Sequence, residues 1–490
     1  MKCDLSEDSK MHTMTEIAGV PAARRWPAYN MIWRWHFYAG LFCIPFIIWL
    51  SITGALYLFK PQIEAVMESS YDHLAVTGTA TSARAQVAAA LAVVPGGVLN
   101  AYELPISPQA AVRVMVGHDA QLTRVYVHPE TLQVLKVEQE DSRLMRILFR
   151  LHGELLMGDR GSMLVELAAS WAIVLIITGL YMWWPRNASG LAGILYPRMR
   201  RGKHLFWRDL HAVTGWWIAI FTLFLLISGL PWAKSWGGML KEVRHFAAGE
   251  VVKQDWTTGR SSELAERRDM NSPVSDASEH AGHSGHGGHG GMSEMGDMGG
   301  MPLKKIDYTP IDRLVGVVQS INLAYPVLIS PPSKKSADWT ARSDAQNRPL
   351  RVSLVLDSES GAIKSRKDFA GRPLLDRIIG IGVAAHEGQL FGWFNQALGV
   401  FTALGLLLVS VSGIVLWWKR RSPDKLGAPK ASQGSPRMSF MLSAVIVTLG
   451  MLLPLLGISL LCVLLLEYAV LRRIPAVSSY LGFNESALKG

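Results

Sequence analysis

The chain has 490 residues, of which 49% are hydrophobic and only 18% are charged. This charged fraction is low for a soluble protein, and together with long uncharged runs it indicates a polytopic membrane protein in contact with lipid. The net charge of +10 does not indicate nucleic-acid binding, because lysines and arginines cluster beside apolar runs and there set topology. The three cysteines form no CxxC or CxxCH motif, so a zinc ribbon and c-type haem attachment are unsupported.

Five apolar runs are long enough to cross a bilayer. A polar leader at 1–31 shows no clear cleavage site, so we expect the first run to be retained. The spans are predicted at 32–59, 163–184, 208–232, 392–418 and 438–468. The last run is over-long and contains Pro454, so we expect a kinked or tilted span.

The short loops at 185–207 and 419–437 are rich in arginine and lysine. By the positive-inside rule, the N-terminus and both loops lie in the cytoplasm, and the two long segments face outward. In a bacterium this predicts a multi-pass protein of the inner membrane with large periplasmic segments. Arg472 and Arg473, in the tail at 469–490, would then lie outside, which leaves the course of the fifth span open.

Each long outer segment, 60–162 and 233–391, is predicted to hold a small α+β module. The first combines a helix at 82–93 with β-rich runs at 98–104, 112–116, 123–127 and 133–137. The second combines a helix at 311–320 with β-rich runs near 327, at 350–356 and at 362–364. The expected fold class is a membrane all-α helical bundle, with a four-helix pseudo-symmetric core, a fifth span and two α+β periplasmic modules.

Four histidines recur in two matched frames. His36 and His211 each begin an apolar run, with a glycine four residues later, Gly40 and Gly215. In both runs a hydroxyl–glycine pair follows, its glycine eighteen residues after the histidine (54 − 36 and 229 − 211). Glycines in membrane helices often serve only close packing, so one such run alone would indicate little.

His152 and His386 share the second frame, beginning HGELLMG and HEGQLFG. A hydroxyl–glycine pair again follows, its glycine twenty-seven residues on (179 − 152 and 413 − 386), and a tryptophan pair ends each run. The tryptophans match an ordinary interfacial belt. The chain is therefore a tandem repeat of span, outer module, histidine motif and span.

Two parallel copies of a helix pair predict a four-helix bundle with a pseudo-twofold axis along the membrane normal. The axis would bring His36 to His211 near the cytoplasmic face and His152 to His386 near the periplasmic face. Two facing imidazoles on opposite sides of a flat metal complex are bis-histidine ligands of a b-type haem, so two haem b groups are expected. Gly40 and Gly215 would leave room for the porphyrin.

Two arginines beside these histidines, Arg34 and Arg208, are candidates to bind haem propionates by bidentate contacts. Topology already explains both arginines, because each precedes a span on its cytoplasmic side. The propionate role and the topological role therefore both stay open.

A low-complexity loop at 250–305 interrupts the second outer segment and lacks the apolar content to pack. It spaces its histidines and methionines at three-residue intervals: His280, His283, His286, His289, Met292, Met295, Met298 and Met301. Imidazole suits Cu(II), nickel and zinc, and thioether suits Cu(I), so the loop is a candidate collector of copper or another metal. The alternative is an unstructured linker of biased composition.

This arrangement resembles the PepSY-associated transmembrane family, whose members alternate four helices with two PepSY-like periplasmic modules and include FoxB-like inner-membrane ferrisiderophore reductases. The resemblance covers about residues 30–420. It rests on WRWH at 33–36, HGE at 152–154, RDLH at 208–211 and HEG at 386–388. It implies two b haems on opposite sides of the membrane and outward electron transfer to ferric chelates.

The leading hypothesis is a haem-dependent metalloreductase for iron acquisition. Electrons would enter at the cytoplasmic haem, pass to the periplasmic haem, and reduce a ferric siderophore or another metal chelate. No GxGxxG motif in a βαβ setting is present, so the donor would be a separate cytoplasmic reductase or a quinol. Two alternatives are a non-catalytic metal-binding or regulatory membrane protein with a copper-collecting loop, and a b-type cytochrome that serves a periplasmic enzyme.

Overall fold

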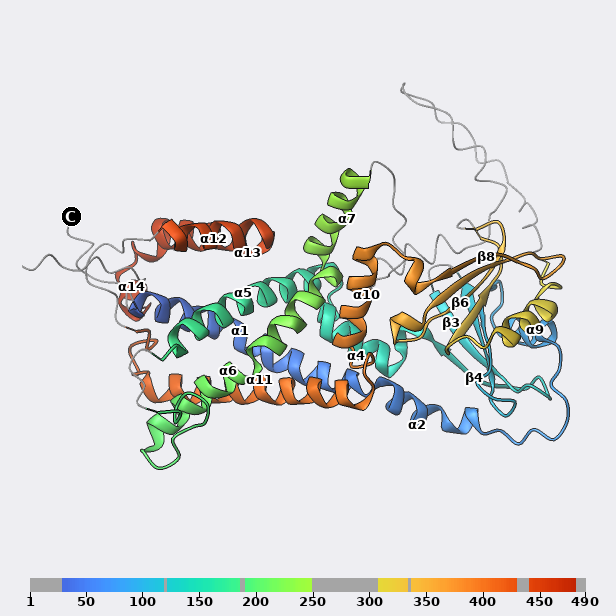
Figure 1. Ribbon diagram of the computed structural model, residues 1–490, viewed down its shortest axis with the longest axis horizontal. Coiled ribbons are helices and arrows are strands. Elements are labelled where there is room, and N and C mark those ends of the chain that lie inside the picture. Colours follow the sequence, from blue (N-terminus) through green and yellow to red (C-terminus); the bar gives the residue numbers. More distant parts are fainter. Residues whose placement is uncertain are drawn as a thin grey trace, which may run out of the picture.

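The computed structural model describes residues 29–118, 121–185, 190–248, 307–333, 336–429 and 440–481. An elongated helical bundle carries a β-sheet at one end (Figure 1). We call this the sheet end and the opposite one the distal end. The leader and the candidate metal-binding loop at 250–305 lie outside the described residues.

Four long helices form the core of the bundle: α1 (Tyr29–Leu58), α5 (Asp159–Trp183), α6 (Lys203–Gly229) and α11 (Trp393–Arg420). α1 packs against α5 and α11, and α6 packs against the same two helices. Together with the helical stretch Pro454–Leu471, they make five helices in the described chain that are long and apolar enough to span a membrane. The chain is a multi-pass membrane protein.

The expected fifth span is divided at Pro454 into two helices, α12 (Phe440–Leu452) and α13 (Pro454–Leu466). A Cβ at Gly457 would lie 2.6 Å from the carbonyl oxygen of Gly450. In one continuous helix, residues seven apart would be separated by about 10.5 Å. The chain therefore reverses at Leu453, and α12 and α13 lie side by side (Figure 1).

This hairpin begins and ends at the distal end. Its tip reaches toward the sheet end, where the Trp236 indole donates a hydrogen bond of 3.0 Å to the Leu452 carbonyl. The following helix α14 (Pro475–Leu481) is back at the distal end, where Tyr38 donates to the Leu481 carbonyl at 2.6 Å. Arg472, expected across the membrane from the basic loops, thus lies on their side, in agreement with the positive-inside rule.

Both outer segments contribute to one eight-stranded antiparallel sheet, in the order β4-β3-β2-β1-β5-β6-β7-β8. The first half is β1 (Val98–Glu103), β2 (Val112–His118), β3 (Gln121–Val127) and β4 (Val134–Gln139). The second half is β5 (Val327–Ser330), β6 (Trp339–Ser343), β7 (Val352–Leu356) and β8 (Ile363–Asp368). The sequence predicts two separate modules, whereas β1 pairs with β5, Tyr102 opposite Ile329, and joins them.

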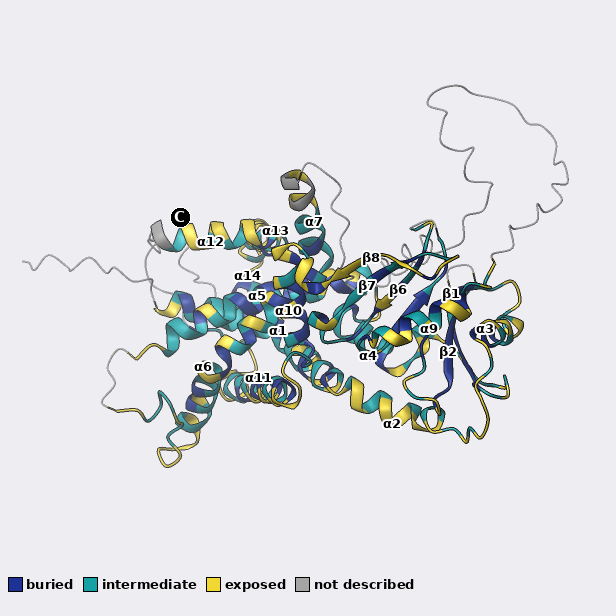
Figure 2. Cartoon of the chain, turned by 45° about the vertical axis from the view of Figure 1, so that its right-hand side comes forward, coloured by how far each residue is buried: buried dark blue, intermediate teal, exposed yellow. Residues whose placement is uncertain are grey.

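Helices α3 (Ala83–Ala92) and α9 (Ile311–Ile321) cover one face of the sheet. Alternate strand residues point into this core, as in β2, where Val114 and Val116 are buried against the helices. Figure 2 shows the dark blue of buried residues along β1 and β2 and the yellow of exposed ones along β8. The sheet is thus a two-layer α/β unit with its own core.

The opposite face of the first half is polar and is covered by α2 (Lys60–Asp72), which continues from α1. Arg113 on β2 binds Glu68 and Asp72 of α2 at 2.8 and 2.6 Å. Short helices then lead from each half of the sheet back into the bundle, α4 (Leu144–Glu154) and α10 (Leu374–His386). α7 (Lys234–Ala248), which follows α6 as α2 follows α1, packs instead against α5 and α13.

Arg124 is buried between two carboxylates, at 2.7 Å from Glu103 and 2.9 Å from Glu140. Burial alone would raise the pKa of Glu140, but Arg124 and Arg143 hold it at about 2. Arg124→Met leaves both carboxylates without this cation and is expected to destabilise the first half-sheet by about 3–5 kcal/mol. Amide hydrogen exchange along β2 and β3 measures the loss, with β6 and β7 as the internal control. Unchanged protection in β3 would contradict the prediction.

Candidate functional site

The four repeated histidines come together in two pairs, one at each end of the bundle. At the distal end, His36 of α1 and His211 of α6 have ring centroids 6.2 Å apart and planes at 89°. At the sheet end, His152 of α4 and His386 of α10 have centroids 6.4 Å apart and planes at 79°. Both pairings are those that the internal repeat predicts.

Each histidine uses Nδ1 to contact a hydroxyl group on a neighbouring helix. The four contacts are His36 to Thr178 at 2.9 Å, His152 to Thr53 at 3.1 Å, His211 to Ser412 at 3.2 Å and His386 to Ser228 at 2.9 Å. These hydroxyls belong to the four hydroxyl–glycine pairs of the repeat. The sequence marks the pairs by their spacing, but not their histidine partners, which lie on other helices.

The partners of these hydroxyls determine which imidazole nitrogen carries the proton. Thr178 donates its own proton to the Val174 carbonyl at 2.7 Å, so its oxygen accepts from Nδ1–H of His36. His211 is fixed more directly, because its Nδ1 also lies 2.9 Å from the Val409 carbonyl, which only accepts. Nε2 therefore keeps its lone pair, as in metal-binding histidines whose other ring nitrogen is hydrogen-bonded.

The glycine of each pair lies against the same histidine ring. A Cβ would come within 3.0 Å of His152 at Gly54, 3.3 Å of His36 at Gly179, 3.4 Å of His211 at Gly413 and 3.5 Å of His386 at Gly229. Distances of 3.0–3.4 Å are tighter than nearly all real Cβ contacts. The hydroxyl thus orients each imidazole, and the glycine leaves it room.

The spacing of the rings matches a single metal ion between them. With metal–nitrogen bonds of about 2.0 Å and about 1.15 Å from nitrogen to ring centre, the centroids would be about 6.3 Å apart. In the described residues, no group of three or more His, Cys, Asp and Glu side chains gathers as a metal site. Each pair alone thus supplies two imidazoles for one metal ion.

The distal pair opens into a cavity of about 960 Å³, near the upper end of the range for cofactor sites. Gly40 and Gly215 line it, and a Cβ at Gly215 would meet nothing within 4 Å. The indole rings of Trp183 and Trp216 stack at 4.1 Å along its wall. The two glycines therefore border open space beside the histidines.

Arg208 also lines this cavity, where it is paired with Asp209 at 2.8 Å. Arg34 does not line it; its guanidinium donates to the Pro429 carbonyl at 2.7 Å, so Arg34 holds the loop after α11. Arg420 and Lys419, at the end of α11, line the cavity, although the sequence does not mark them. Arg208, Lys419 and Arg420 are thus candidates to bind an acidic group of a ligand, as is Arg198, which also lines the cavity.

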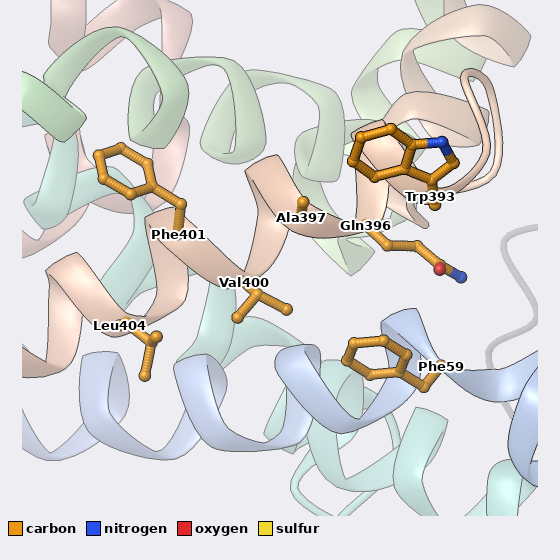
Figure 3. A pocket seen from close by; sticks show the side chains of 7 residues that line it. All are labelled: Phe59, Trp393, Gln396, Ala397, Val400, Phe401 and Leu404. Carbon is orange, nitrogen blue, oxygen red and sulfur yellow. The ribbon is translucent and has the colours of Figure 1, made fainter.

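A second hollow, of about 470 Å³, lies between the sheet-end parts of α1 and α11 (Figure 3). Phe59 faces it from the junction between α1 and α2, and Trp393, Val400 and Phe401 line it from α11. It includes neither a histidine nor an ionisable side chain. Its apolar lining suits an acyl chain, so it is not the candidate site.

The family model described as the PepSY-associated TM region matches residues 33–420 of the chain. This range includes all four histidines and excludes the hairpin of α12 and α13. A comparison with curated proteins finds no match.

Proposed function

Because the chain belongs to the family of the PepSY-associated TM region, we propose that it is a di-haem b electron-transfer protein that reduces metal chelates across a membrane. The chelate would be a ferric siderophore or a related complex, as for the FoxB-like reductases that the sequence resembles. The observation that carries the proposal is the geometry of the histidine pairs, whose ring centroids, 6.2 and 6.4 Å apart, have the spacing of two imidazoles on one metal ion.

One haem would bind between His36 and His211, and the other between His152 and His386. When bound, haem iron supplies reversible one-electron transfer. Thr178, the other three hydroxyls and the adjacent glycines orient the imidazoles that would hold the haems. The carboxylates of the distal haem would meet Arg208, Lys419 and Arg420.

The two pairs stand near opposite ends of the bundle. Along α1, eighteen residues separate His36 from Gly54, which touches His152, a rise of about 27 Å. This is close to the roughly 30 Å hydrocarbon core of a bilayer. Electrons would therefore pass from a cytoplasmic reductase or a quinol at the distal end to a chelate at the sheet end. Reduction of Fe(III) to Fe(II) weakens its hold by hard oxygen ligands and frees the metal.

The distal end would face the cytoplasm, because the basic loops and the tail gather there, and the sheet would lie in the periplasm of a bacterium. Cysteines introduced by Arg421→Cys and Arg472→Cys are expected to react from the cytoplasmic side and Lys364→Cys from the other. Impermeant maleimide on right-side-out and inverted vesicles tests this, with Cys3 and Cys462 replaced by serine. Labelling of positions 421 and 472 from opposite sides would contradict the hairpin.

The function is tested by a spectrum and a rapid-mixing experiment on the purified protein. We expect the Soret and α bands of a low-spin b haem, and rapid oxidation of the dithionite-reduced protein by a panel of ferric siderophores. A protein without haem that binds copper would support the metal-binding alternative instead. If the protein contains haem but no chelate oxidises it, the result would favour a b-type cytochrome that donates electrons to a periplasmic enzyme.

Gly54 is the tightest of the four glycine contacts, at 3.0 Å, and Gly229 the loosest, at 3.5 Å. Both touch histidines of the sheet-end pair. Gly54→Ala is therefore expected to displace His152 and weaken sheet-end haem binding about tenfold or more, whereas Gly229→Ala changes it less. Haem content of the two variants, measured by pyridine haemochrome, checks the order. Equal retention would show that the glycines serve helix packing alone.

A further inference from the structure

The two halves of the sheet carry an arginine at the same position, but the side chains around it differ. Arg143 follows the 3₁₀ turn after β4, and Arg372 follows the 3₁₀ turn after β8. Arg143 is surrounded by acids, at 2.5 Å from Glu68, 3.2 Å from Glu140 and 3.4 Å from Glu64. Its pKa is raised by these carboxylates, although burial and Arg124 oppose the shift. The cation of the first half is thus neutralised within the protein.

Arg372 has a different environment. At the start of its 3₁₀ turn, Phe369 stands where Glu140 stands in the first half, and the Arg372 guanidinium lies 5.7 Å from the centre of its ring. The Nε of Arg372 is buried and has no hydrogen-bond partner among the described residues. A buried guanidinium nitrogen without a hydrogen-bond acceptor costs free energy. The guanidinium of Arg372 is therefore suited to an acceptor that a ligand supplies.

Two further arginines beside Arg372 share this property. Arg348 is 8% exposed, and Arg377 lies in the first turns of α10; the Nε of each is buried without a hydrogen-bond partner in the described chain. Arg348 and the Phe369 ring both contact the position of Gly380 on α10, so the segments that carry Arg348, Arg372 and Arg377 meet there. Arg348 also faces Glu387, but at 3.5 Å.

Two buried acids, Glu387 and Asp376 beside Arg377 on α10, compensate part of the charge of these three arginines. Burial lowers the pKa of the neighbouring Arg351 to about 10, and Arg348 adds to this lowering, against Asp344. On the adjoining face of the sheet, Arg342 pairs across the strands with Ser353, which pairs with Lys367. Both basic residues are exposed. In the first half, Arg113 and Arg124 on this face are buried under acids.

We propose that Arg348, Arg372 and Arg377 form an anion site at the sheet end that binds the carboxylates of an anionic ferric chelate. This inference rests on the proposed function and names the class of its substrate. Planar guanidinium groups bind carboxylates through paired hydrogen bonds. A hydroxycarboxylate chelate such as ferric citrate presents uncoordinated carboxylates to these groups, because its central hydroxyl is deprotonated and bound to the iron.

The site lies beside the sheet-end histidines. The Arg348 guanidinium is 5.9 Å from the centre of the Trp232 ring, and that ring is 5.6 Å from His386. Arg377 precedes His386 by nine residues of α10 (386 − 377), about 13 Å along the helix. A chelate held by these arginines would rest one side chain away from the electron-donating pair. The exposed Arg342 and Lys367 would attract it from solution.

Binding is measured with gallium(III) citrate, which has the charge and shape of the ferric complex but is not reduced. We expect the wild-type protein to bind it, and Arg372→Gln and Arg377→Gln to weaken binding at least about tenfold each, as for a lost charge-assisted hydrogen bond. The matched control is Arg366→Gln, whose arginine is exposed and paired with Asp368 on the same strand. Isothermal titration in phosphatidylcholine nanodiscs gives the affinities.

A second measurement distinguishes a chelate from a lipid headgroup as the bound anion, because a phosphate group could bind to the same arginines. If the anion is a lipid phosphate, gallium citrate does not bind, and the two variants instead lose co-purifying phosphatidylglycerol. That outcome, or unchanged citrate binding in both variants, would overturn the proposal.

A rapid-mixing experiment tests the anion site and the reductase function separately. Wild-type reduced protein should be oxidised by ferric citrate and by a ferric trihydroxamate without net negative charge. Arg372→Gln should slow only the citrate reaction. Oxidation by neither chelate would refute the reductase, whereas oxidation by both at wild-type rates in the variant would refute only the anion site.

Discussion

Replacing both sheet-end histidines, His152→Ala with His386→Ala, is expected to halve the haem content and abolish rapid reduction of ferric chelates. The distal double variant, His36→Ala with His211→Ala, should also keep one haem, but dithionite can still reduce it and a chelate can still oxidise it. The difference follows from position, because the sheet-end pair lies at the end of the bundle that, in the proposed orientation, a periplasmic chelate would reach.

Two measurements on each variant check this expectation. Pyridine haemochrome gives the haem content per protein, and stopped-flow absorbance gives the rate at which ferric chelate oxidises the reduced protein. His73→Ala is the matched control, because His73 is exposed and its Nδ1 contacts the Ser69 carbonyl of the preceding helix, far from both histidine pairs in sequence. If the distal variant lost the fast chelate reaction while the sheet-end variant retained it, the assigned direction of electron flow would be reversed.

The pairing of the four histidines could be predicted from the sequence, because it depends on a repeat rather than on side-chain packing. His36 and His211 occupy matching frames, so any pseudo-symmetric bundle must place them at one end. The family resemblance, drawn from the residues around them, is confirmed by the match over 33–420. The strands of the first half were also predictable, since their valines alternate with polar residues, as in β2.

Other features depend on contacts between distant segments and left no local signal. β6 (Trp339–Ser343) has a short mixed sequence and was not predicted, although Trp339 and Ala341 are buried in the core. The pairing of β1 with β5 joins segments more than two hundred residues apart. The hairpin was hidden because a 31-residue apolar run (438–468) has the composition of one span, and only Pro454 indicated a break.

The hydroxyl–glycine pairs could be recognised from the sequence, but their role could not. Their spacing marks them as part of the repeat, but the common interpretation of such glycines is helix packing. Only the structure shows that Thr178 contacts His36 and that Thr53 contacts His152, in each case from a different helix. In each half of the repeat, the hydroxyl–glycine pair of the first span contacts the second histidine, and the pair of the second span contacts the first histidine. These contacts explain why the glycine follows the histidine by eighteen residues in one frame and by twenty-seven in the other.

Thr178→Val provides the sharpest test of that role, because valine keeps the shape of threonine and removes only the hydroxyl acceptor. Nδ1–H of His36 then loses the oxygen at 2.9 Å that fixes its tautomer and strengthens Nε2 as a ligand. We expect distal haem affinity to fall about 10–100-fold. The reduction potential of that haem should rise, since a weaker donor stabilises Fe(III) less. Thr178→Ser should restore both properties.

The matched control is Thr402→Val, which removes another buried threonine hydroxyl, from α11. Thr402 is 1% exposed and donates to the Leu398 carbonyl at 2.8 Å, as Thr178 donates to Val174. A purely structural effect of losing a buried hydroxyl would therefore appear in both variants. Haem transfer to apomyoglobin and a spectroelectrochemical titration distinguish the two cases, and equal behaviour of the variants would show that Thr178 merely packs. An altered potential in Thr178→Val alone would establish that the hydroxyl–glycine pairs tune the histidines they touch.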